Sequence, residues 1–226
     1  MQPLALLHDA REVLAATLRV LRDSTRTEDI HRVEEITGRA RVAELVGSAR
    51  AGDPSIADLL RDRPVFDATT VDFEALRRLP AESLGGAYVR HLDDHGIEVH
   101  AAETSDEFIA DADARYLIYR YRQTHDVWHV LVGVGIAGHE EVLIHAFAYG
   151  QVRLPVSAMI MALGGVKHLV LEGRWLALRR GLLAAYRSGR DADPLLGVRW
   201  EALWDRDLDE VRRRFGVRPL PPAITS

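Results

Sequence analysis

The chain has 226 residues, 47% of them hydrophobic, which is enough to bury one substantial core and favours one domain over two. Its net charge of −5 gives no electrostatic reason to expect nucleic acid as a partner. The sequence contains no cysteine, which excludes disulfides, thiolate metal ligands and cysteine nucleophiles.

The N-terminus carries no secretory signal pattern, because Asp9, Arg11 and Glu12 interrupt the apolar start at once. We therefore expect the mature chain to begin near Met1 and the protein to be cytoplasmic, with peripheral contact at the inner face of the membrane as a further expectation. Lysine occurs only at Lys167, and all other basic residues are arginine. This bias indicates GC-rich coding and hence a bacterial source.

Helical periodicity dominates the first 50 residues. Residues 4–21 place apolar side chains at helical spacing with charges opposite, so we predict an amphipathic helix there. Thr25 and Glu28 form a capping-box pattern for a second helix that runs toward Gly38, and residues 39–49 are compatible with its continuation.

Three short helices are predicted between residues 53 and 96 from their terminal residues. Asp53 and Pro54 are typical of a cap and first turn. A second short helix stops at Pro80, and Ser83 begins a third that ends at Gly96.

Three histidines near the end of the third short helix, His91, His95 and His100, invite interpretation as a metal site. We reject this interpretation from the sequence, because they lie among exposed polar residues at a helix end, where histidine interacts favourably with the helix dipole.

The motif with the clearest chemistry lies in a long helix, since apolar residues recur at spacings of three, four and seven between Leu117 and Val132. On an ideal helix His129 lies about 40° and Asp126 about 100° round from His125, so all three share a face. That face is apolar above and below, and buried polar groups need partners. A divalent metal ion suits two imidazoles and a carboxylate.

A second helix, after the glycine-rich turn, supplies further candidates. Glu141 and His145 are four residues apart, so either can reach the first cluster across a helix hairpin. We predict a catalytic role for His145, as a hydrogen-bonding or proton-transferring group; the alternative is a packed core histidine. For the pair His125 and His129 as well, two hydrogen-bonded core residues remain the alternative to a metal site.

His125, Asp126 and His129, followed by Glu141 after eleven intervening residues, resemble the HDxxH-x11-E signature of the ubiquinone-biosynthesis Coq family, fourth member. The long spaced motif is specific. Weaker matches to the same family extend over nearly the whole chain, at residues 35–38, 61–64, 79–85, 119–122, 154–155, 200–204 and 215–217.

The resemblance implies that His125, Asp126, His129 and Glu141 bind one divalent ion; zinc, iron, manganese and magnesium all remain open, because these ligand types serve all four. It implies an enzyme that removes or oxidatively replaces the C1 carboxyl of a prenylated hydroxybenzoate-type ring, with Asp126 as a catalytic candidate. The catalytic role predicted for His145 rests on its spacing from Glu141, since the family motif ends at Glu141. Two alternatives stay open: a non-catalytic scaffold for isoprenoid or quinone intermediates, and a family member recruited to tailor an aromatic or polyketide natural product.

Residues 154–165 form the most continuous apolar run, which is too short to span a membrane. We interpret it as a buried core helix, with a groove for an isoprenoid tail as the functional alternative. Further helices are predicted over 169–186 and 200–215, and the proline-rich tail 219–226 should be loosely ordered.

The sequence therefore predicts an all-α protein of about eight or more helices in a single compact domain over residues 1–226, with the metal site between two antiparallel helices. The expected partners are a hydrophobic and possibly prenylated small-molecule substrate, a membrane surface, and either a second copy of the chain as a homodimer or other biosynthetic enzymes.

Overall fold

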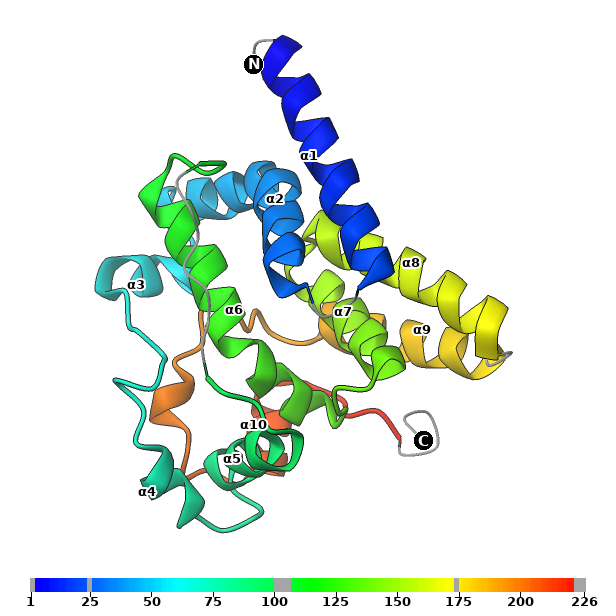
Figure 1. Ribbon diagram of the computed structural model, residues 1–226. Helices are drawn as coiled ribbons and strands as arrows, with labels where there is room; N and C mark the ends of the chain where they lie inside the picture. The colour runs from blue at the N-terminus through cyan, green and yellow to red at the C-terminus, as the bar shows by residue number, and fades with distance from the viewer. Residues whose placement is uncertain (1–2, 24–25, 100–106, 173–174, 222–226) are drawn as a thin grey trace.

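The computed structural model describes residues 3–23, 26–99, 107–172 and 175–221. Within these ranges the regular structure is helical, apart from one isolated bridge between Ser83 and Asp207 (Figure 1). The α-helices are α1 (Pro3–Arg22), α2 (Thr27–Arg50), α3 (Pro54–Asp62), α4 (Phe73–Arg77), α5 (Leu84–His95), α6 (Ala112–Val132), α7 (Gly138–Val152), α8 (Pro155–Glu172), α9 (Trp175–Asp191) and α10 (Leu208–Phe215). The prediction of an all-α protein of about eight or more helices is confirmed.

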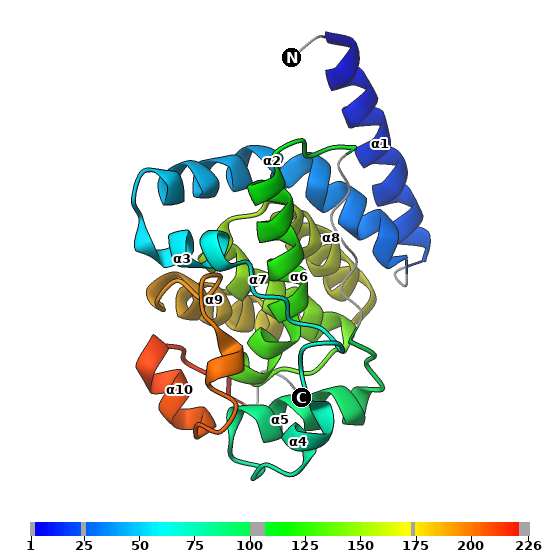
Figure 2. The same ribbon diagram turned by 90° about the vertical axis from the view of Figure 1, so that its left-hand side faces the viewer.

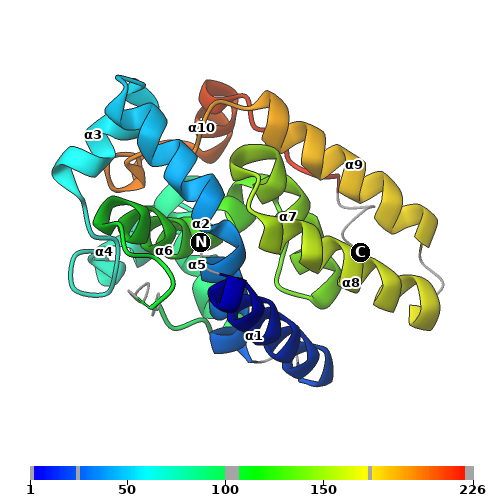
Figure 3. The same ribbon diagram turned by 90° about the horizontal axis from the view of Figure 1, so that it is seen from above.

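Helix α6 runs through the middle of the molecule and packs against α2, α3, α5 and α7 (Figure 2). Helix α7 lies between α6 and the pair α8 and α9 (Figure 3). Helices α7 and α9 approach so closely at Gly150 that a Cβ atom there would lie only 2.6 Å from the carbonyl oxygen of Tyr186. Buried side chains from nearly every helix join in one hydrophobic core, and α6 supplies some of its largest members, including Leu117, Trp128 and Leu131.

The caps confirm the predicted starts of the first and third short helices and the end of the third, whereas the second, α4, ends at Arg77, before the predicted stop at Pro80. The Asp53 side chain accepts a hydrogen bond from the Ser55 amide at 2.9 Å, and Ser83 caps α5. Gly96 ends α5 in the left-handed conformation. Helix α2 continues through Gly38, where the side chain of Leu154 fills the space beside the glycine. The predicted cap at Thr25 lies outside the described residues.

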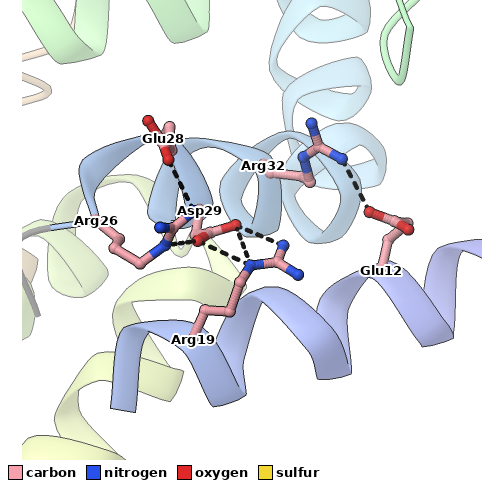
Figure 4. Close-up of polar contacts among 6 residues, drawn as sticks. All are labelled: Glu12, Arg19, Arg26, Glu28, Asp29 and Arg32. Atoms are coloured by element: carbon pink, nitrogen blue, oxygen red, sulfur yellow. Dashed lines mark hydrogen bonds and ion pairs between the residues drawn. The ribbon is translucent and has the colours of Figure 1, made fainter. Parts of the chain in front are cut away.

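Helices α1 and α2 form a hairpin whose contact face is crossed by charged pairs (Figure 4). Arg19 and Arg26 both bond to the buried carboxylate of Asp29, with Arg19 at 2.6 Å. Arg32 of α2 reaches back to Glu12 of α1 at 2.9 Å. These pairs fix which side of α1 faces the protein.

The apolar stripe of α1 therefore points away from the core. Leu7, Leu14 and Leu21 are more than half exposed and Leu18 is 45% exposed, whereas Ala16 on the opposite side is fully buried. The N-terminal part of α1 stands clear of the other helices in Figures 1 and 2. The helix was correctly predicted as amphipathic, but its leucine side is not its core side.

The Asp29 ion pairs make the α1–α2 hairpin sensitive to acid. Hydrogen bonds from Arg19 and Arg26 lower the pKa of Asp29 to about 2, from 3.8. Their stabilising effect is complete above pH about 4 and is lost as pH falls through about 2. We expect backbone amides of α1 to exchange hydrogen faster, relative to their intrinsic rates, as pH falls through this window.

Asp29→Asn should show this faster exchange already at pH 5, with no further step between pH 4 and 2. Asp94→Asn, at an exposed carboxylate of α5, should behave as the parent does. Equal protection of α1 in the parent and in Asp29→Asn would show that these pairs do not hold the hairpin together.

The predicted helix over 200–215 is wrong in its first half. A short 3-10 helix, Trp200–Ala202, precedes α10, and the intervening backbone bonds to α5 instead of continuing as helix. The amides of Leu84 and Gly85 donate to the carbonyls of Arg206 and Trp204 at 2.8 and 2.9 Å. These bonds satisfy amides that the first turn of a helix leaves without intrahelical partners.

The prediction of a loose tail over 219–226 is wrong for Leu220. This side chain is buried, and its amide donates to the carbonyl of Val132 at the end of α6, at 2.8 Å. A helix end leaves such carbonyls without partners, so α6 gives the tail a docking position. Residues 222–226 lie outside the described residues.

The apolar run at 154–165 forms the first part of α8, which continues to Glu172. Val156 and Ser157 are buried, while Met159, Ile160 and Met161 are only partly buried and pack on the rim of the core. This part of α8 therefore buries only some of its apolar side chains and is not a fully buried core helix. Across the described ranges, no helix has both the length and the hydropathy that crossing a membrane requires.

Candidate metal centre

The clustered side chains come from the hairpin of α6 and α7. Asp111 caps the start of α6 by accepting bonds from the amides of Asp113 and Ala114, and Gly133 ends the helix with φ 75°. Glu140 closes the turn into α7 by accepting bonds from the amides of Gly135 and Ala137.

The structure brings together His125 and His129 of α6 with Glu141 of α7. The two Nε2 atoms lie 3.1 Å apart, and the Glu141 carboxylate oxygens lie 3.7 Å from Nε2 of His129 and 3.9 Å from Nε2 of His125. One possible ligand atom from each residue lies within 4.8 Å of the others. As predicted, residues that could bind a metal ion meet between two antiparallel helices.

The triad fits a divalent cation by its donor chemistry. Two nitrogen ligands at about 2.1 Å from one ion lie about 3.0 to 3.4 Å apart at octahedral or tetrahedral angles, which matches the spacing of the two Nε2 atoms. His129 can donate from Nδ1 to the Gly135 carbonyl at 2.9 Å, which would leave the lone pair of Nε2 directed to the cluster.

The electrostatics of the triad also favour a cation. Burial lowers the pKa of His129 to about 3, so this imidazole is neutral and able to ligate at pH 7. Burial alone would raise the pKa of Glu141, but the neighbouring His125 and His129 outweigh it and lower the pKa. Burial alone would lower the pKa of His125, but the neighbouring Glu141 outweighs this effect and raises the pKa. A carboxylate and two imidazoles thus meet in a largely buried place.

Asp126 does not join this triad, although the sequence predicted it as a ligand. The groups that meet at one position are His125, His129 and Glu141. Burial raises the pKa of Asp126, and its charge acts on Tyr88 of α5. Because successive residues of a helix differ by about 100°, Asp126 faces α5 while its neighbour His125 faces α7.

His145 of α7 lies beside His125. The two ring centroids are 5.6 Å apart, and Nδ1 of His145 lies 3.2 Å from the buried hydroxyl of Ser157 on α8. Burial lowers the pKa of His145 to about 3. This predicted catalytic residue is therefore a neutral imidazole beside the triad and outside its ligand set.

His91 also lies next to the triad, which the sequence did not predict. We expected an exposed histidine near a helix end, but the ring lies 5.4 Å from that of His129 and 4.6 Å from that of the exposed His95. Only the packing of α5 on α6 brings it there. His100 lies outside the described residues.

The sequence also gave no sign of a buried charge cluster next to the site. Arg122 of α6 bonds to Glu34 at 2.7 Å and to Glu35 at 2.9 Å, and all three side chains are at most 6% exposed. Burial raises the pKa of Glu34. The cluster ties α2 to α6 one helical turn before His125.

The fold and the site together define a class: all-helical proteins that present two histidines and a glutamate on a helix hairpin. A family model described as "Coenzyme Q (ubiquinone) biosynthesis protein Coq4" matches residues 2–221 of this chain. The chain belongs to the Coq4 family, as its motif suggested.

Individual relatives agree with this assignment. A mitochondrial ubiquinone biosynthesis protein COQ4 from Paracoccidioides brasiliensis is 29% identical over 219 residues, 97% of this chain and 76% of its own length. The protein of that name from Aspergillus terreus is 32% identical over 175 residues, covering 76% of this chain and 59% of the relative. A crystal structure described as that of a "Putative ubiquinone biosynthesis protein" from Nostoc punctiforme has a TM-score of 0.73 at 25% identity, over 92% of this chain and 98% of that one.

These relatives correct the expected location. The curated relatives are named as mitochondrial proteins, which contradicts the prediction of a cytoplasmic protein with contact at the inner face of the membrane. These curated relatives are fungal and lend no support to the expected bacterial source, whereas the solved structure comes from the bacterium Nostoc punctiforme. The absence of a secretory signal does not discriminate between the other compartments, so the sequence provides no basis for a cytoplasmic location.

Proposed function

We propose that this protein is a metal-dependent enzyme that removes the C1 carboxyl group from a prenylated hydroxybenzoate-type ring. The convergence of His125, His129 and Glu141 from two helices carries the proposal, and membership of the Coq4 family supports its direction. A divalent ion at this triad would bind a carboxylate or phenolate oxygen of the substrate and stabilise negative charge that develops there.

In this reaction the bond between C1 and the carboxyl carbon breaks, and carbon dioxide leaves. The electron pair stays on C1, which then takes up a proton. Asp126, the next residue after His125, and His145, whose ring lies 5.6 Å from that of His125, are the groups proposed to hold or deliver that proton. Replacement of the carboxyl by a hydroxyl would in addition require an external oxidant such as dioxygen.

His129→Ala should reduce the content of divalent metal by an order of magnitude or more, because it removes one of three ligands and leaves an incomplete donor set. Protein purified with zinc, iron(II), manganese or magnesium supplied is to be measured by elemental analysis. The matched control is His8→Ala, at an exposed histidine on α1, which should load as the parent does. Equal loading of parent and His129→Ala, or an empty parent, would disprove the metal centre.

Turnover then separates an enzyme from a scaffold. Loaded parent protein incubated with a prenylated 4-hydroxybenzoate should yield a product that lacks the carboxyl group, identified by mass spectrometry. Hydrogen at C1 indicates simple decarboxylation, and a hydroxyl at C1 indicates oxidative replacement. Tight binding of the prenylated ring without any product, in protein with its full metal content, would favour the scaffold.

A further inference from the structure

His91 of α5 has an unsatisfied polar atom at the edge of the metal triad. Its Nε2 atom is buried and has no hydrogen-bond partner among the residues that the structure describes. Buried polar groups in native proteins nearly always have a partner, because leaving one without a hydrogen bond costs free energy. None of the described side chains or backbone groups supplies a partner for this nitrogen, so it is free to bond to a ligand.

The position of His91 shows where such an atom would come from. Five imidazole rings follow one another at centroid distances of 4.6, 5.4, 4.8 and 5.6 Å, in the order His95, His91, His129, His125 and His145. His95 is exposed and His129 is 1% exposed. His91 thus lies between the exposed ring of His95 and the buried ring of His129.

His91 stays outside the ligand set itself. The three groups whose donor atoms meet are His125, His129 and Glu141. Three protein ligands leave at least one coordination position of a divalent ion for an exogenous ligand. A ligand oxygen at that position would lie near the rings that surround the triad, and the ring of His91 is in contact with that of His129.

We propose that His91 is a ligand-binding residue, whose Nε2–H donates a hydrogen bond to an oxygen of the aromatic carboxylate or phenolate held at the triad. This inference rests on the proposed metal centre. It assigns α5 a part in recognising the substrate, in addition to the α6–α7 hairpin that supplies the metal ligands.

The test uses the full chain loaded with cobalt(II), whose visible absorption changes when its ligands change, and 4-hydroxybenzoate as the titrated probe. His91→Phe keeps an aromatic ring and removes the hydrogen bond. It should weaken the apparent Kd for 4-hydroxybenzoate by about 10-fold or more, as expected for a lost hydrogen bond to a charged group, while cobalt affinity changes less than about twofold. His91→Gln, which retains an N–H donor, should recover part of the loss.

The matched control is His95→Phe, at the exposed neighbouring ring on the same helix, which should bind 4-hydroxybenzoate as the parent does. Equal Kd values for the parent and His91→Phe would overturn the role of His91 and leave the metal centre standing. So would a cobalt-loaded parent that shows no response to 4-hydroxybenzoate. Loss of cobalt from His91→Phe at an unchanged melting temperature would make His91 a metal-site residue, against this inference. A parent that takes up no cobalt would refute the metal centre itself.

Discussion

Replacing His145 with glutamine should lower turnover on the prenylated hydroxybenzoate by two to four orders of magnitude, on the order of 10² to 10⁴, while the metal content stays that of the parent. This is the usual contribution of a positioned general acid or base. His145 is placed for it: the ring lies beside His125 of the proposed metal site, and the Ser157 hydroxyl, 3.2 Å from Nδ1, orients it. Glutamine retains a hydrogen-bonding group of similar size.

The experiment compares kcat, metal content and melting temperature of the parent and His145→Gln. A packed core histidine would instead give unchanged turnover, with any loss confined to the melting temperature. Ser157→Ala provides a second readout, because it removes the hydroxyl beside Nδ1 without touching the imidazole. It should lower kcat by less than His145→Gln does, and with no change in metal content. Unchanged kcat in both variants would leave His145 as a structural residue.

Replacing Arg122 with methionine should destabilise the protein by about 3–5 kcal/mol, the usual cost of breaking a buried ion pair from one side. Methionine retains much of the apolar length of arginine but removes the guanidinium that bonds to Glu34 and Glu35. The free energy of unfolding is to be measured by urea denaturation at pH 7. Arg61→Met is the matched control, since Arg61 pairs with Asp58 and Asp62 at the surface and is 66% exposed; its effect should stay below about 1 kcal/mol.

The sign of the pH dependence adds a second check on Arg122→Met. Burial already raises the pKa of Glu34, and loss of the arginine will raise it further. A group whose pKa is raised by folding stabilises the folded state below its unfolded pKa and loses that effect as pH rises through the folded value. The difference in stability between parent and variant should therefore be smaller at pH 5 than at pH 7. An equal difference at both values would show that Glu34 does not take up the lost charge.

Local signals made most helix boundaries predictable. Ser83, Gly96 and Gly133 act through their own backbone and immediate neighbours, so the sequence contains the whole cause. The 200–215 segment was mispredicted because its backbone bonds to α5, more than a hundred residues earlier in the chain. The leucine stripe of α1 was assigned correctly to one face, but only the ion pairs with α2 decide which face meets the protein.

For the site, the sequence by itself determined the pairing of His125 with His129, because a fixed rotation per residue places residues four apart on one helix face. It also placed Glu141 within reach, because a short turn folds α7 back along α6. Only the tertiary structure decided that Asp126 stands apart from the triad, that Arg122 holds two carboxylates beside it, and that His91 touches it. Each of these depends on how α2 and α5 pack across α6, and periodicity along one helix carries no information about the distance or angle to another.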